Sequence, residues 1–163
     1  MPFAYYDRLT RGQKVIYRKS DEVTAVRLPE AAALRPLVDD LAGALAGEDR
    51  LKTEAAAQRL LAGLVFHLDV PAVRVEVLAA RPARSWGELH GLYNSAERGR
   101  PAHVTLWMRT ARQKRVVAFR TFLRTLLHEL GHHLDYTLLG LEDSFHTEGF
   151  YKRESSLFHQ LMR

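Results

Sequence analysis

The chain has 163 residues, enough for one domain with a buried core, and 47% of them are hydrophobic. It contains no cysteine, which excludes disulfides and a cysteine-based zinc ribbon and fits a reducing cytoplasm. The net charge is +5, and the sequence contains neither an apolar run of membrane-spanning length nor the apolar centre of a secretory signal. We therefore expect a single cytoplasmic domain, residues 1–163, with no membrane partner; composition leaves its oligomeric state open.

Three helices are predicted in the first half of the chain. Their ranges are about 10–19, 29–46 and 51–67, where apolar residues recur at helical spacing and few residues break the pattern. Thr10 and Gln13 have the spacing of a capping box, which predicts where the first helix begins.

Three short strands are predicted next. Residues 73–77 and 103–109 alternate between apolar and polar side chains, whereas the pattern over 89–93 is weaker. Breaks that contain proline and glycine separate the three segments. With a long helix following them, the expected fold class is α+β: a small three-stranded sheet packed on helices.

The long helix carries the most informative motif, His128-Glu129-Leu130-Gly131-His132, which has the form H-E-x-x-H. Histidines four residues apart lie on one face of a helix, so both imidazoles can bind one Zn²⁺ while Glu129 reaches a metal-bound water as general base. At about 100° per residue, the opposite side of this helix is apolar. That apolar side consists of Phe119, Phe122, Leu123, Leu126 and Leu130. His133 falls with the apolar residues and is expected to pack in the core or to support a ligand rather than to bind the metal. Asp135 lies on the histidine face and could orient a ligand imidazole; the alternative is an ordinary surface aspartate.

A catalytic zinc site usually has three protein ligands and a water molecule, so a third ligand is expected downstream. The position where a metzincin has its third histidine is Leu138, which argues against that group. The helix is expected to end near Gly140, and a second helix, capped by Asp143, Ser144 or Thr147, is expected to run to about Leu161. Two candidates remain: His146 at the start of this second helix and Glu154 about two turns inside it.

These residues resemble a SprT-like metalloprotease domain. Such domains have H-E-x-x-H, a short connection, and a third histidine in an H-G-x-x-F pattern at the head of the next helix. Here the second pattern is His146-Thr147-Glu148-Gly149-Phe150, with Thr147 in place of the first glycine. The resemblance covers about the last third of the chain and the order of elements before it. It implies a minimal zincin-like fold and metal ligands at His128, His132 and His146.

In zincins an edge strand borders the cleft and pairs with an extended substrate backbone, and a small sheet before the metal helix resembles that arrangement. Residues 103–109 are the candidate for this strand; an ordinary core strand is the alternative, because the sequence does not show which edge is free.

The basic residues are unevenly distributed. From Arg98 to Arg124 there are eight lysines or arginines and no acidic residue. A basic rim over 98–124 could bind nucleic acid through its phosphates, in agreement with the DNA-associated proteolysis that the SprT-like resemblance implies. The alternative is a solvated basic face.

The sequence thus predicts a zinc-dependent endopeptidase that acts on protein or peptide substrates, with Glu129 as general base. Tyr151 or Arg124 could stabilise the oxyanion. One alternative is a regulatory gluzincin of the ImmA/IrrE type, which would use Glu154 as third ligand. Another is a non-enzymatic zinc-binding interaction module, which would have a closed site of four protein ligands.

Overall fold

The structure, a computed structural model, describes residues 2–84, 87–88 and 90–163. Its elements, in chain order, are the 3-10 helix η1 (Ala4–Arg8), α1 (Arg11–Glu22), α2 (Ala31–Ala46), α3 (Arg50–Leu68), β1 (Val73–Ala80), β2 (Ala83–Arg84), β3 (Gly87–Glu88), β4 (Gly91–Asn94), β5 (Ala102–Arg109), α4 (Phe119–Thr137) and α5 (Glu148–Leu161). This arrangement confirms the expected mixture of helices with a small three-stranded sheet.

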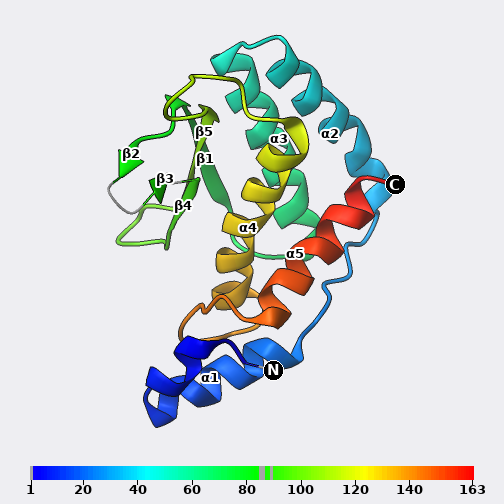
Figure 1. The fold of residues 1–163 in the computed structure, drawn as a ribbon. Helices are drawn as coiled ribbons and strands as arrows, with labels where there is room; N and C mark the ends of the chain where they lie inside the picture. Colours follow the sequence, from blue (N-terminus) through cyan, green and yellow to red (C-terminus); the bar gives the residue numbers. More distant parts are fainter. Residues whose placement is uncertain (1, 85–86, 89) are drawn as a thin grey trace.

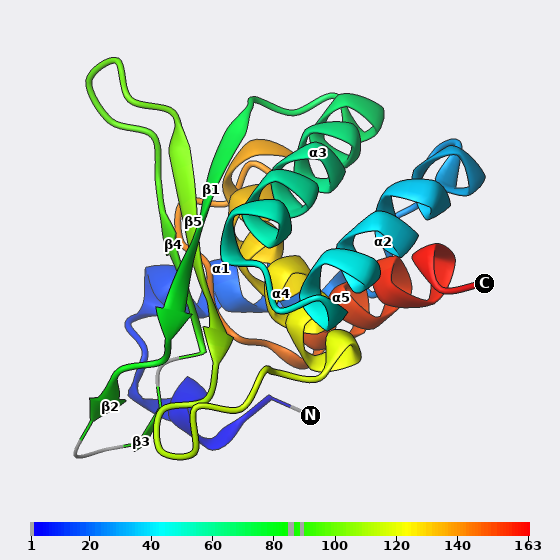
Figure 2. The same cartoon turned by 90° about the horizontal axis from the view of Figure 1, so that it is seen from above.

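The sheet lies on one side of the molecule; α3 and α4 lie against one of its faces, and α2 and α5 lie beyond these two helices (Figure 2). Its strand order is β1-β5-β4, with β1 parallel and β4 antiparallel to β5. Strand β1 alternates between buried and exposed residues, as the period-2 pattern of its sequence predicts. The buried side packs on α3 and α4. The most deeply buried residues there include Leu60, Leu64, Val77, Val104, Leu123, Leu126, Leu127 and Leu130.

Strand β5, residues 102–109, is the central strand of this sheet. The hypothesis that 103–109 forms the cleft edge is therefore wrong, and the alternative of a core strand is correct. The edge strand on the α4 side is β4. It corresponds to the weaker segment predicted over 89–93, of which Leu89 lies outside the described residues. A short strand without strong alternation gives little sequence signal, and its place at the edge follows from the strand order.

The two edges of the sheet differ in what lies against them. On the outer edge of β1, Gln58 accepts from Val75 N–H at 2.9 Å and donates to the Val73 carbonyl at 3.1 Å. Glu54 accepts from Val77 N–H at 3.1 Å. Side chains of α3 thus satisfy the backbone groups of β1. In the described part of the chain no strand pairs with the outer edge of β4, which makes it the candidate edge for a further extended chain.

The helix ends agree with their local sequences. Thr10 and Gln13 form the predicted capping box of α1, which continues three residues past the predicted end to Glu22. Thr147 caps α5, accepting from Phe150 N–H. None of the helices in the described ranges is both long and apolar enough to cross a lipid bilayer.

Candidate metal centre

Helix α4 lies in the middle of the molecule, between the sheet and α5 (Figure 1). Its apolar side is buried in the core, as the helical wheel predicts. On its other side the rings of His128 and His132 lie next to each other, with centroids 5.2 Å apart. One turn of helix therefore suffices to place the first two candidate ligands.

The third candidate, His146, lies in the segment between α4 and α5 and points back to this pair. Its Nε2 is 3.2 Å from Nε2 of His128 and 3.0 Å from Nε2 of His132. One ligand atom from each of the three residues lies within 4.8 Å of the others. Zn–N bonds of 2.0–2.1 Å in a tetrahedron would separate two ligand nitrogens by about 3.3–3.4 Å, close to the observed spacing.

The outer nitrogens of the two helix histidines are held by acceptors. Nδ1 of His128 is 2.9 Å from a carboxylate oxygen of Glu154. Nδ1 of His132 is 2.7 Å from the hydroxyl of Ser144, and that hydroxyl donates to Asp135. Both Nδ1 atoms must therefore donate, which leaves both Nε2 atoms with a free lone pair in the neutral rings.

These lone pairs converge on Nε2 of His146, an arrangement that a bound cation stabilises. Burial and the neighbouring imidazoles lower the pKa of His132 to about 3, and burial lowers the pKa of His146 as well. His132 is thus neutral at pH 7, the form that a metal ligand requires. The donor set fits a divalent transition metal that accepts imidazole ligands.

Glu129 lies beside the imidazoles and opposite the edge strand. Its carboxyl group is almost buried, at 6% exposure, and burial raises its pKa to about 7. A Cβ atom at Gly91 of β4 would lie 2.9 Å from Oε2 of Glu129 and 2.9 Å from Cγ2 of Thr125. Only glycine therefore lets β4 pass this close to the carboxylate.

A groove of about 350 Å³ opens over these groups. It is lined by Gly91, Leu92, Tyr93 and Ser95 from β4 and the residue after it, His128, Glu129, His132 and Tyr136 from α4, and Ser144 and His146 from the segment that follows α4. The three imidazoles and Glu129 thus face a solvent-accessible groove, one wall of which is the edge strand.

His133 is not part of the cluster and instead joins α4 to the edge strand. It is buried, its Nε2 lies 2.8 Å from the Pro71 carbonyl, and its Nδ1 lies 2.8 Å from the hydroxyl of Tyr93. Because a carbonyl only accepts, Nε2 donates to it, and the Tyr93 hydroxyl donates to Nδ1. The expected packing role is confirmed, together with a hydrogen bond that fixes β4 next to the groove.

The structure separates the two candidates for the third ligand. Glu154 contacts the outer side of His128 and also pairs with Arg124 at 3.5 Å, so its carboxylate lies behind an imidazole and away from the three Nε2 atoms. This ion pair holds the side chain of Arg124 against Glu154 of α5. The ring of Tyr151 lies near both His128 and His146, with centroids 5.9 and 5.8 Å away.

Two polar residues that the sequence does not assign to the metal centre are connected to the three histidines by hydrogen bonds. Ser144, predicted only as a helix cap, links Asp135 to His132, so Asp135 acts on the imidazole through a hydroxyl. Arg153 is buried and donates to the other oxygen of Asp135 at 3.0 Å. No local pattern predicts either contact, since each requires α5 or the loop before it to return to α4.

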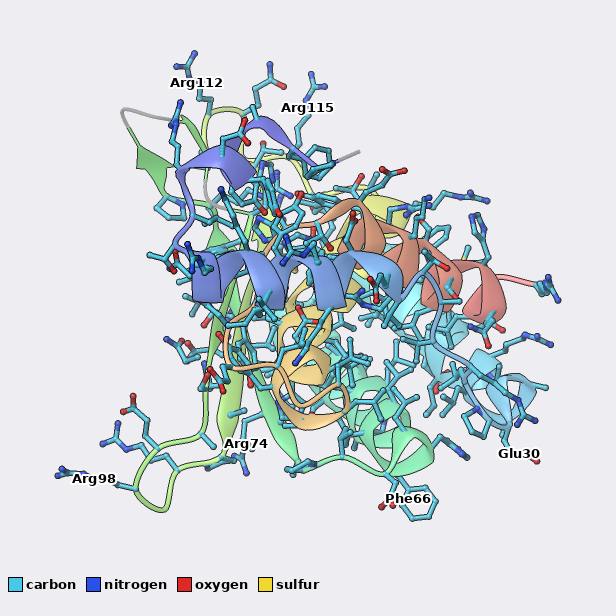
Figure 3. All side chains as sticks on the ribbon, turned by 90° about the horizontal axis from the view of Figure 1, so that it is seen from below. Glu30, Phe66, Arg74, Arg98, Arg112 and Arg115 are labelled. Carbon is cyan, nitrogen blue, oxygen red and sulfur yellow. The ribbon has the colours of Figure 1, made fainter. Side chains whose placement is uncertain are left out.

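The basic residues of 98–124 do not form one surface. Arg98 lies at one end of the molecule and Arg112 and Arg115 at the other (Figure 3). The intervening strand β5 has eight residues, which span roughly 25 Å at about 3.3 Å per residue. Arg109 is paired with Glu48 at 2.8 Å. Nucleic-acid binding stays a prediction, and the two basic groups would have to contact phosphates separately.

Comparison with known proteins finds no family model, no curated protein sequence and no solved structure that matches this chain. The function is therefore inferred from the geometry of the site.

Proposed function

We propose that this chain is a zinc-dependent endopeptidase with a zincin-like arrangement, as its resemblance to SprT-like domains implies. The observation that carries the proposal is the position of Glu129, a nearly buried carboxylate between the converging imidazoles and the edge strand β4. A structural zinc site has no need of such a base, whereas metal-assisted hydrolysis does.

His128, His132 and His146 would hold the zinc ion through their Nε2 atoms. When bound, zinc supplies a Lewis acid for the scissile carbonyl and lowers the pKa of a coordinated water toward neutrality. Glu154 would keep His128 oriented through Nδ1, and Ser144 with Asp135 would do the same for His132.

Two parts of the chain would act on the substrate. The backbone of β4 would pair with an extended peptide and hold it along the groove, while Glu129 accepts the proton of the attacking water and passes it to the leaving amine. The occupied edge of β1 supports the choice of β4, since Gln58 and Glu54 already satisfy the outward backbone groups of β1.

The rival hypotheses differ in the ligand set. A regulatory gluzincin would use Glu154 in place of His146, which conflicts with the contact between Glu154 and Nδ1 of His128. A non-enzymatic module would need a fourth protein ligand. Among the described residues, the group of histidines, aspartates and glutamates able to hold one ion contains three members. That number leaves a coordination position for water.

Hydrolysis of an unfolded protein tests the proposal, with Gly91 as the informative position. We expect the zinc-loaded parent to cut casein internally. Gly91→Ala should retain zinc but lose on the order of 100-fold in kcat/KM, because the new methyl group displaces the Glu129 carboxylate by a substantial fraction of an ångström. Gly12→Ala is the matched control, since a Cβ there meets no atom within 4 Å.

The assay follows the appearance of new amino termini. A zinc-loaded parent that leaves casein intact would contradict the endopeptidase. Equal rates for Gly91→Ala and Gly12→Ala would contradict a role in hydrolysis for the Glu129 carboxylate at its position beside β4.

A further inference from the structure

The third imidazole is held differently from the other two. Nδ1 of His128 donates to Glu154, and Nδ1 of His132 donates to Ser144. Within the described residues, the ring of His146 has hydrogen-bond contacts with His128 and His132 alone. Its ring packs near Phe150 and Tyr151, with centroids 5.3 and 5.8 Å away, and apart from this packing its orientation depends on how its backbone is fixed.

That backbone lies in residues 138–147, which contain neither helix nor strand. The segment is held by the beginning of the chain. The hydroxyl of Tyr5 donates to the carbonyl of His146 at 2.8 Å, across 141 positions of sequence. The rings of Tyr5 and Tyr17 lie 6.5 and 6.2 Å from the ring of Phe145.

Helix α1 fixes the residues on the other side of His146. The hydroxyls of Ser20 and Thr147 are 2.9 Å apart, and Asp21 accepts from the backbone N–H of Gly149 at 3.0 Å. A Cβ atom at Gly149 would lie 2.6 Å from the carbonyl oxygens of Ser20 and Asp21. Only glycine allows the start of α5 to approach the end of α1 this closely. In Figure 1, α1 accordingly crosses beneath the start of α5 and the loop before it.

Of these contacts, the hydrogen bond from Tyr5 is the one made directly to His146. We propose that Tyr5 is a positioning residue for the third metal ligand: its hydroxyl holds the His146 carbonyl so that the imidazole stays over His128 and His132. The inference rests on the proposed metal site and adds a role for a segment that contributes no ligand. This role also accounts for the placement of η1, whose tyrosines pack on Tyr17 of α1 and on Phe145 in the segment 138–147 that carries His146.

The test compares two tyrosines of the same turn. Tyr5→Phe removes the hydroxyl and keeps the ring contacts, and we expect it to weaken zinc binding about 10-fold, the lower range for an outer partner of a ligand. Tyr6→Phe is the matched control. Its hydroxyl accepts from Arg18 at 2.6 Å and its ring also packs on Tyr17, so it loses a comparable hydrogen bond away from the ligand loop.

Zinc affinity is measured by competition with a chromophoric chelator, and both variants are repeated in a His146→Ala background. If Tyr5 acts through the imidazole, its effect on affinity disappears once that imidazole is removed. Suppose that the parent binds zinc through His146 but that Tyr5→Phe and Tyr6→Phe bind zinc equally well. That result would overturn the role of Tyr5 and leave the proposed metal site standing. An effect that persists in the His146→Ala background would also overturn it, since Tyr5 would then act on the fold in general. A parent without zinc affinity would overturn the metal site itself.

Discussion

Replacing Glu129 with glutamine should leave zinc binding and folding intact while reducing peptide hydrolysis by about 10²- to 10⁴-fold, the usual contribution of a general base. The amide has nearly the same shape as the carboxyl group, so it fits the buried position beside Gly91, but it does not accept the proton of water. The measurement is kcat/KM on a quenched-fluorescent peptide, with zinc content determined on the same samples.

Glu142→Gln provides the control, since it makes the same chemical change at an exposed residue of the loop after α4. We expect it to hydrolyse the peptide at the parental rate. Comparable rates for Glu129→Gln and the parent would refute the general-base role and would favour a module that only binds zinc.

Among substitutions outside α4, removal of the His146 imidazole should weaken metal binding the most. We expect His146→Ala to weaken zinc binding by at least about 100-fold, whereas Glu154→Gln should weaken it about 10-fold because that side chain contacts His128 only through Nδ1. His159→Ala, an exposed histidine of α5, should match the parent.

The order of these two effects separates the hypotheses. A larger loss for Glu154→Gln than for His146→Ala would indicate a gluzincin-like ligand set. It would also remove the basis of the SprT-like resemblance, and with it the main reason to expect substrates on DNA. His128, His132 and Glu129 would keep their proposed roles.

The parts of the site that were predictable from sequence are local. His128, Glu129 and His132 lie within one turn and a half of helix, so periodicity alone places them on one face, and the structure has them there. The same periodicity places His133 outside the ligand face, in agreement with its contacts to Pro71 and Tyr93. Thr147 as a cap and the capping box at Thr10 likewise depend on neighbours three residues away.

The remaining parts depend on contacts between distant segments. Where His146 and Glu154 lie relative to the two helix histidines depends on the packing of α5 on α4, which the sequence does not give. The contact of Tyr5 with His146 gives no signal in either segment, nor does the bridge of Ser144 between Asp135 and His132. Alternation favours β5 as the strand at the groove because its pattern is the stronger one, whereas the strand order, which the sequence does not reveal, puts β4 there.

The most direct test of the central claim is the metal content of the purified chain. Elemental analysis should find about one zinc per parent chain, and none retained after gel filtration in the His128→Ala/His132→Ala double variant, because these two imidazoles form the core of the site. Full zinc occupancy in that double variant would contradict the account.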